Sequence, residues 1–244
     1  MKKILLGFAL SVVVLQSCKK DDDVVDEAVI LSQEEQNTYD DAAAIAFLEN
    51  NYFDAKGNIV PFDNTVTTDD AFPKLSSYNP VTLPSGVIYL KRTNAQPEPG
   101  KVVNPTDVIS IMQVTKSYVS AKVNDKIIFN GEATFSNNVA GSGVPTSDPA
   151  YYYVKSSVLK KYNDTYGTSH GRSFYEIKGL QEGLKYFNAF DMDPSAEYNM
   201  QGVIIVPSRA AFGRNLNFYA YVDRSFVFNF QLYNTRARIL PSED

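Results

Sequence analysis

The chain has 244 residues, of which 44% are hydrophobic and 21% charged. These proportions are those of a folded globular protein and exclude disorder along the whole length. The formal net charge of −5 argues against a nucleic-acid partner, because such proteins present a basic surface. With one Cys, one His and no Trp, the sequence excludes an internal disulfide and a Cys/His zinc site. We therefore expect neither metal nor cofactor, and any chemistry must come from carboxylates, hydroxyls, backbone groups or apolar shape.

The first eighteen residues carry the ordered features of a secreted lipoprotein. Two lysines precede an apolar run over residues 4–15, which is too short to span a membrane and has the length of a secretory signal core. The quartet LQSC at residues 15–18 follows and resembles the lipobox of bacterial lipoproteins, in which cleavage precedes the Cys and its sulfur takes up lipid. The sequence therefore predicts a signal peptide over residues 1–17 and lipidation of Cys18.

Residues 18–31 are predicted to form an acidic tether. Five of the nine residues from Lys19 to Glu27 are acidic, and such a run cannot bury a core. An acidic run after the lipidated Cys also resembles the surface-export signal of Bacteroidota lipoproteins. We expect a protein of the cell envelope that lipid holds on a membrane without spanning it, at the outer membrane and facing the periplasm or the exterior.

The segment after the tether begins with one amphipathic helix. Ser32 and Glu35 form a capping box, and apolar residues then recur at helical spacing, which predicts a helix over residues 33–52. This helix could mediate homodimerisation or pack on its own domain. Residues 60–82 are rich in Asp, Thr, Pro and Ser and are predicted to be irregular.

From residue 86 onward the sequence pattern is that of short strands separated by turn residues. Strands are predicted at 86–90, 108–114, 126–129, 202–206 and 226–232, with short helices at 156–161 and 180–187.

Several segments between about residues 83 and 236 resemble the FKBP-type peptidyl-prolyl cis-trans isomerases. They are 84–89 (PSGVIY), 106–111 (TDVISI), 128–130 (IFN), 177–184 (IKGLQEGL), 202–213 (GVIIVPSRAAFG) and 226–232 (FVFNFQL). The resemblance implies an α+β fold, with an FKBP-like curved antiparallel sheet, or half-barrel, wrapped over one short helix and a hydrophobic pocket between them. The expected organisation is a helical and irregular extension over residues 32–82 and an FKBP-like domain over 83–244, interrupted by a long insertion at 136–173.

The activity that the resemblance implies is rotation about X-Pro bonds in extracytoplasmic, proline-containing polypeptides. That amide is planar, and its rotation faces a barrier of about 18–20 kcal/mol. A protein can lower the barrier without a nucleophile, by holding the proline in an apolar cavity and binding the twisted amide more tightly. The resemblance places the backbone N–H of Ile177 on a substrate carbonyl and makes walls of Phe228 and Phe129.

Four positions of the implied pocket depart from the family pattern. Leu180 replaces a Trp at the floor, and Phe212 replaces a Tyr whose hydroxyl binds substrate. Asn130 replaces an Asp that orients the bound carbonyl, and Gln113 replaces a Tyr on the inner face of the sheet. Two functions therefore stay open. One is a prolyl isomerase that assists folding; the other is a non-catalytic FKBP-like lipoprotein that recognises polypeptide or glycan.

The insertion matters for that choice, because it carries five tyrosines. They are Tyr151, Tyr152, Tyr153, Tyr162 and Tyr166. Tyrosine offers a large contact area with little rotamer entropy, so these rings could bind a polypeptide or glycan over the pocket. The alternative, which we favour, is that they cover a small core of the insertion itself.

Two other classes of site receive little weight. His170 lies in a polar loop without the G-x-S-x-G turn of a hydrolase nucleophile. Asp191, Asp193, Glu197 and Glu182 could pair as a glycosidase requires, but they fall in one polar insertion and on one helix face, where solvated carboxylates are expected.

Overall fold

The computed structural model describes residues 31–244, and residues 32–244 form one compact α+β unit. The α-helices are α1 (Gln33–Glu49), α2 (Ser156–Tyr166) and α3 (Lys178–Leu184), and the 3₁₀ helices are η1 (Leu75–Tyr78), η2 (Arg172–Phe174), η3 (Ser208–Ala210) and η4 (Leu216–Tyr221). The strands are β1 (Asn51–Phe53), β2 (Ile59–Pro61), β3 (Val81–Thr82), β4 (Ile88–Lys91), β5 (Lys101–Val102), β6 (Val108–Val123), β7 (Lys126–Asn137), β8 (Thr146–Ser147), β9 (Asn188–Ala189), β10 (Gly202–Val206) and β11 (Arg224–Arg236).

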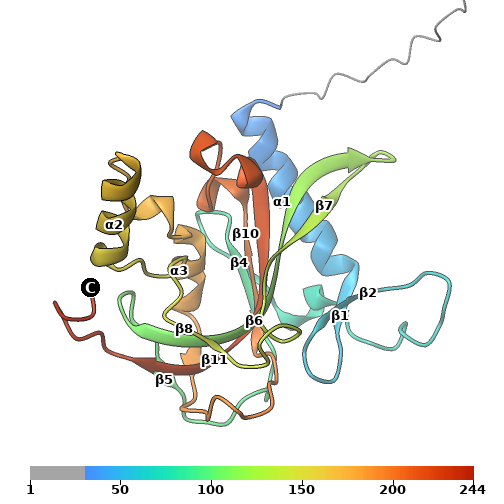
Figure 1. The fold of residues 1–244 in the computed structure, drawn as a ribbon. Coiled ribbons are helices and arrows are strands. Elements are labelled where there is room, and N and C mark those ends of the chain that lie inside the picture. Colours follow the sequence, from blue (N-terminus) through green and yellow to red (C-terminus); the bar gives the residue numbers. More distant parts are fainter. Residues whose placement is uncertain (1–30) are drawn as a thin grey trace, which may run out of the picture. The chain divides into compact units, whose positions relative to one another are not determined.

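The main sheet is antiparallel and has the strand order β3-β4-β10-β11-β6-β7, with β8 also paired to β6. Helix α1 covers one face and α3 covers the other (Figure 1). Strand β10 explains how both faces are filled: Val203 and Ile205 point into the core under α1, whereas Ile204 and Val206 point into the core under α3. An unbroken apolar run is the expected pattern for a strand buried on both faces.

Helix α1 begins as the sequence predicts. The Ser32 hydroxyl accepts from the Glu35 N–H at 3.2 Å, and the Glu35 carboxylate accepts from the Ser32 N–H at 2.8 Å. The helix ends at Glu49, three residues before the predicted end, because Asn51 starts β1. It packs on its own sheet, mainly against β6 and β7.

One buried carboxyl group joins α1 to two distant segments. Asp40 has no exposed surface, and its Oδ1 accepts from Gln36 at 2.8 Å and from the Ser120 hydroxyl at 2.7 Å. Its Oδ2 accepts from the N–H and the hydroxyl of Ser208, at 2.9 and 2.6 Å. Asp40 thus ties the helix to β6 and to the turn at η3.

Helix α3 lies close against β10 because two of its residues are glycines. A methyl group at Gly179 would overlap Val206 and lie 2.9 Å from Val87. One at Gly183 would lie 2.8 Å from Ile204. Real Cβ atoms do not approach so closely, and the spacing of the two glycines therefore sets the distance between helix and sheet.

Strands β6 and β7 form a much longer hairpin than the sequence predicts. Strand β7 continues past residue 129 to Asn137, because Gly131 adopts a positive φ of 57° and the register shifts nearby. A second shift leaves Phe135 without a Cα partner, since Thr134 pairs with Lys116 and Ser136 with Thr115. Such bulges change the face to which the following side chains point.

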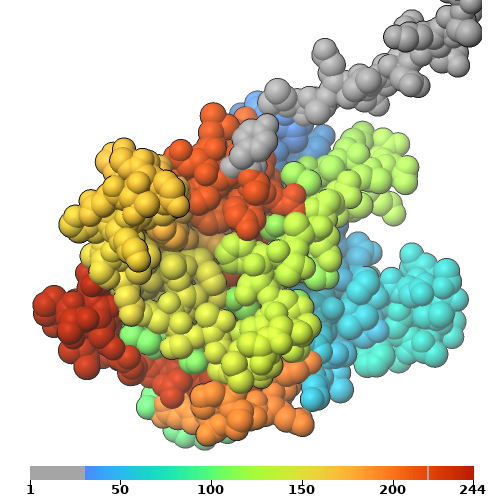
Figure 2. All heavy atoms as spheres, viewed as in Figure 1, coloured from blue at the N-terminus to red at the C-terminus, as the bar shows by residue number. Residues whose placement is uncertain are grey.

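Part of the insertion packs on the domain, whereas Tyr162 packs on Tyr166 and His170 of the insertion itself. Tyr152 and Tyr153 are buried in the same hydrophobic cluster as α3 and β11, and the Tyr152 hydroxyl donates to the carbonyl of Asn104 at 2.7 Å. The preferred expectation of a separate core is therefore wrong for these residues. Figure 2 shows residues of the insertion, in yellow-green and gold, spread over this side of the molecule.

The predicted signal peptide, the lipidation of Cys18 and nearly all of the tether fall outside the described residues. Within residues 31–244, no helix is both long and apolar enough to cross a membrane.

Candidate functional site

Four of the six residues expected in the pocket lie in one hydrophobic cluster between α3 and the sheet. Ile177 and Leu180 come from the start of α3, and Phe228 comes from the centre of β11. Phe212 follows η3 and packs at the edge of the cluster, with its ring centroid 5.8 Å from that of Phe226. The segments that carry the resemblance therefore do converge.

The other two expected residues lie elsewhere. Phe129 belongs to the cluster under α1, where its ring lies 5.8 Å from that of Phe47. Asn130 is exposed near the hairpin tip, and its side chain accepts from the N–H of Gly131. The expectation that both line the same pocket as Ile177 is wrong, because the bulges of β7 put Phe129 on the opposite face of the sheet.

Phe135 is the aromatic residue of β7 that faces the candidate site. Its ring lies 5.2 Å from that of Phe226 and 6.3 Å from that of Phe228. The sequence holds two aromatic residues in this strand, six positions apart, and alternation would put both on one face. Only Gly131, a frequent residue of β-bulges, indicated that the register changes between them.

The site is filled by Tyr151 of the insertion. Its ring lies 5.4 Å from that of Phe135 and 6.4 Å from that of Phe228, and its hydroxyl accepts a hydrogen bond from the Gln113 side chain. Burial raises the pKa of the Tyr151 hydroxyl well above its ordinary value, so the group stays protonated. The ring of this chain's own tyrosine thus packs against the hydrophobic cluster that α3 and β11 share.

The backbone N–H of Ile177 is also engaged. It donates to the carbonyl of Tyr151 at 2.8 Å. The resemblance implies that this N–H binds a substrate carbonyl, and here a carbonyl of the insertion takes that bond. Ile177, Leu180 and Phe228 have no exposed surface, so a proline ring cannot touch them in this conformation.

A row of partly exposed rings extends outward from the closed site, and we call it the aromatic surface. It consists of Tyr162, Tyr166, Phe174, Phe212 and Phe218. Successive ring centroids lie 4.6–4.8 Å apart along the row. Tyr166 has 66% of its surface exposed, and the neighbouring Leu216 has 74% exposed. The surface therefore joins α2 and η2 of the insertion to η4.

The single histidine and the acidic residues are engaged locally. His170 stacks on Phe174 with ring centroids 4.0 Å apart, which is a packing contact. Each of the four carboxylates has a partner nearby: Glu182 accepts from Ser85, Asp193 from Ser195, Asp191 pairs with Lys101 and Glu197 with Lys56. The side chains do not form a paired acidic site.

Comparison with known proteins finds no family model that matches the chain. No curated protein sequence matches it either. Among solved structures, FkpA from Escherichia coli is similar at 16% identity and a TM-score of 0.34, over 64% of this chain and 51% of FkpA. A peptidyl-prolyl cis-trans isomerase from Pseudomonas syringae is similar at 11% identity and a TM-score of 0.39, over 85% of this chain and 98% of that protein. The match thus spans about half the length of FkpA.

Proposed function

We propose that this chain is an FKBP-like protein of the cell envelope that binds polypeptide without isomerising it. The observation that carries the proposal is the occupied site, in which Tyr151 supplies both the ring and the carbonyl that a prolyl substrate would bring. Its ring stands among Phe135 and Phe228, and its carbonyl accepts from Ile177.

The physical argument concerns what rotation of a prolyl bond requires. An isomerase must surround the proline with apolar walls and bind the twisted amide better than the planar one. Here the walls already contact one another and Tyr151, and the N–H donor is already used. A substrate would have to displace a ring and break one backbone hydrogen bond before the chemistry begins, which raises the barrier that catalysis should lower.

The aromatic surface is the part of the chain that supports polypeptide binding. Tyr166 of this surface and Leu216, which adjoins it in η4, expose large apolar side chains. Tyrosine and phenylalanine rings dominate the centres of protein interfaces because they bury much area with few rotatable bonds. An extended, apolar segment of a non-native protein is the occupant that fits a row of such rings.

A second candidate is a prolyl isomerase from which Tyr151 withdraws. One observation favours it: Ile177, Leu180, Phe212 and Phe228 lie together in the cluster that the resemblance implies. If the insertion lifts away, these residues would line an apolar cavity with a released N–H at its side. The two candidates differ in whether the pocket ever opens to substrate.

A protease-coupled isomerisation assay on a prolyl tetrapeptide p-nitroanilide separates the candidates. The proposal expects the wild type and Tyr151→Phe to show only the uncatalysed rate, because both keep the ring in place. Tyr151→Ala removes the ring, and acceleration in this variant alone would show that Tyr151 closes a competent site. Acceleration by the wild type that Phe228→Ala abolishes would overturn the proposal in favour of the isomerase.

The binding part is tested with reduced, carboxymethylated α-lactalbumin, which cannot fold, labelled for fluorescence anisotropy. Tyr166→Ser and Leu216→Ser should each weaken its binding about tenfold, since each removes exposed apolar contact area. Val102 on β5 is 66% exposed and lies outside the aromatic surface, so Val102→Ser is the matched control. Equal affinity in all four proteins would refute a role for this surface.

We also propose that lipid on Cys18 holds the protein at the outer membrane, which the order of features in residues 1–18 supports. Metabolic labelling with a palmitate analogue should mark the wild type and leave Cys18→Ser unmarked.

A further inference from the structure

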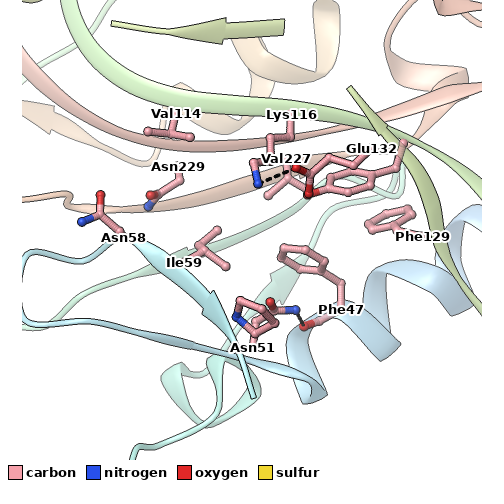
Figure 3. Close-up of a pocket in the computed structure, with 12 residues that line it drawn as sticks. Phe47, Asn51, Asn58, Ile59, Val114, Lys116, Phe129, Glu132, Val227 and Asn229 are labelled. Carbon is pink, nitrogen blue, oxygen red and sulfur yellow. Dashed lines mark hydrogen bonds and ion pairs between the residues drawn. The ribbon is translucent and has the colours of Figure 1, made fainter. Parts of the chain in front are cut away.

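A second hollow lies on the opposite face of the sheet, under α1, and the proposed function does not use it. It has a volume of about 270 Å³, near the lower end for small-molecule pockets. The end of α1, the β1–β2 hairpin, β6, β7 and β11 each contribute to its lining (Figure 3). These elements come from both ends of the described chain, so the hollow exists only when the whole unit is folded.

The first feature that points to a ligand is a buried amide without a full set of partners. Asn229 is 2% exposed, and its side-chain nitrogen donates to the carbonyl of Gly57 at 3.0 Å. Asn229 lines the hollow, and its buried Oδ1 has no hydrogen-bond partner among residues 31–244. A buried carbonyl oxygen without a donor is rare in proteins, and a hydroxyl or N–H of a bound molecule would satisfy it.

The second feature is a preassembled aromatic wall. The rings of Tyr118 and Phe129 stack with centroids 5.1 Å apart and planes 15° apart. Phe47 packs against both, at 5.9 and 5.8 Å. Because the three rings support one another, their positions need no rearrangement when a ligand binds.

The charges of the lining cancel. Lys116 and Glu132 form an ion pair at 2.6 Å, and Glu132 also accepts from the Tyr118 hydroxyl at 3.0 Å. The remaining polar residues of the lining are the amides Asn51, Asn58 and Asn229. A phosphate or an ammonium group would find no uncompensated charge here, whereas a neutral molecule could donate its hydroxyls to the amide oxygens. The amide nitrogens already donate within the protein.

A second depression adjoins the hollow at the aromatic wall. This depression shares Phe47, Asn51 and Phe129 with the hollow and adds Ala46, Asn50 and Ile128. Its volume is also about 270 Å³. Two adjoining hollows that share aromatic and amide residues suit a chain of rings better than a single compact molecule.

We propose that this face binds a neutral oligosaccharide, with one sugar ring in the hollow of Figure 3 and the next along the depression beside Phe47. A hydroxyl group donates to Asn229, and the apolar face of the ring lies against the aromatic wall. This site is separate from Tyr151 and the aromatic surface, so its existence does not depend on the proposed polypeptide binding.

The test uses cellotriose, maltotriose and tri-N-acetylchitotriose as probes, with calorimetry and the side-chain amide signals of the asparagines in ¹H–¹⁵N spectra. At least one probe should bind saturably and shift the Asn229 signals. Asn229→Ala should weaken that binding about tenfold, the effect of one lost hydrogen bond. Because Asn229 also holds Gly57, Phe129→Ala provides a second variant that leaves this bond in place and should weaken binding similarly.

Tyr186→Ala is the matched control, since Tyr186 is a partly exposed ring that stacks on Tyr89 and lies outside both hollows. Its affinity for the probe should equal that of the wild type. Failure of all three saccharides to bind at about 10 mM, which corresponds to an affinity too weak for function, would overturn the proposal. So would equal affinity in Asn229→Ala and Phe129→Ala. Saturable binding of acetyl-tyrosine amide in place of any saccharide would assign the hollow to peptide side chains and overturn it as well.

Discussion

Replacing Asp40 by Ala should destabilise the protein strongly, although the residue lies on the first helix of the described chain. The side chain accepts from Gln36, from the Ser120 hydroxyl, and from both the N–H and the hydroxyl of Ser208. Asp40 and Ser208 have no exposed surface. Removing the carboxyl group therefore leaves donors that water cannot reach.

The loss of unfolding free energy depends on whether each donor can find another acceptor once the carboxyl group is removed. A buried donor without a partner costs about 1–3 kcal/mol. The Ser208 N–H is fixed in the backbone and bears this cost in full, whereas the two hydroxyls and the Gln36 amide can rotate toward other acceptors and bear part of it. We expect a loss of about 3–4 kcal/mol. For a unit of this size that is a fall in Tm of about 10 °C.

The neighbouring residue supplies the control. Asp41 pairs with Arg209 at 2.6 Å but is 54% exposed, and such surface pairs contribute about 0–1 kcal/mol. Urea and thermal unfolding of Asp40→Ala and Asp41→Ala measure the difference. A loss below about 1 kcal/mol in Asp40→Ala, no greater than that in Asp41→Ala, would refute the reasoning.

Three further predictions concern packing and pH. Burial alone would raise the pKa of Asp148, but its bonds with Arg238 and the charge of Lys155 outweigh burial and lower that pKa. In urea unfolding, the wild type should therefore be more stable than Asp148→Asn above about pH 4, and this difference should shrink as the pH falls further. Gly179→Ala should lower the unfolding free energy by about 1–3 kcal/mol through overlap with β10, whereas Gly171→Ala, with open space around it, should not change thermal unfolding. Phe135→Ala should lower the free energy of unfolding in urea by about 2–4 kcal/mol, because it opens a cavity beside Tyr151. An unchanged free energy of unfolding would contradict the packing of Phe135 against the core.

Much of the fold can be predicted from local pattern. The capping box fixes the start of α1 at Ser32, and the apolar run 202–206 is a strand buried on both faces, as β10 shows. The predicted short helix at 180–187 is present as α3, shifted toward Lys178. These features depend on neighbours in sequence, which is the information that periodicity carries.

The arrangement of the site could not be predicted in the same way. The face that Phe129 occupies depends on register shifts in β7, which add single residues and leave the hydrophobic pattern unchanged. The engagement of the Ile177 N–H depends on Tyr151, 26 positions earlier, and no local pattern indicates which ring of the insertion enters the core. Resemblance located the converging segments but not the residue that fills the space between them.

The contact between Asp40 and Ser208 has a consequence for biosynthesis. The two residues are separated by 168 positions, and a chain emerging from the ribosome presents its N-terminal segments first. Helix α1 can form early, since its cap is local, but the acceptor at its centre finds its backbone donor only when the region of η3 has been made. Strand β6, on which the helix packs together with β7, also gains its partner β11 late. The first helix of residues 31–244 is thus among the last elements to be secured, and a ribosome stalled before residue 208 should carry a nascent chain whose α1 is readily cleaved by protease.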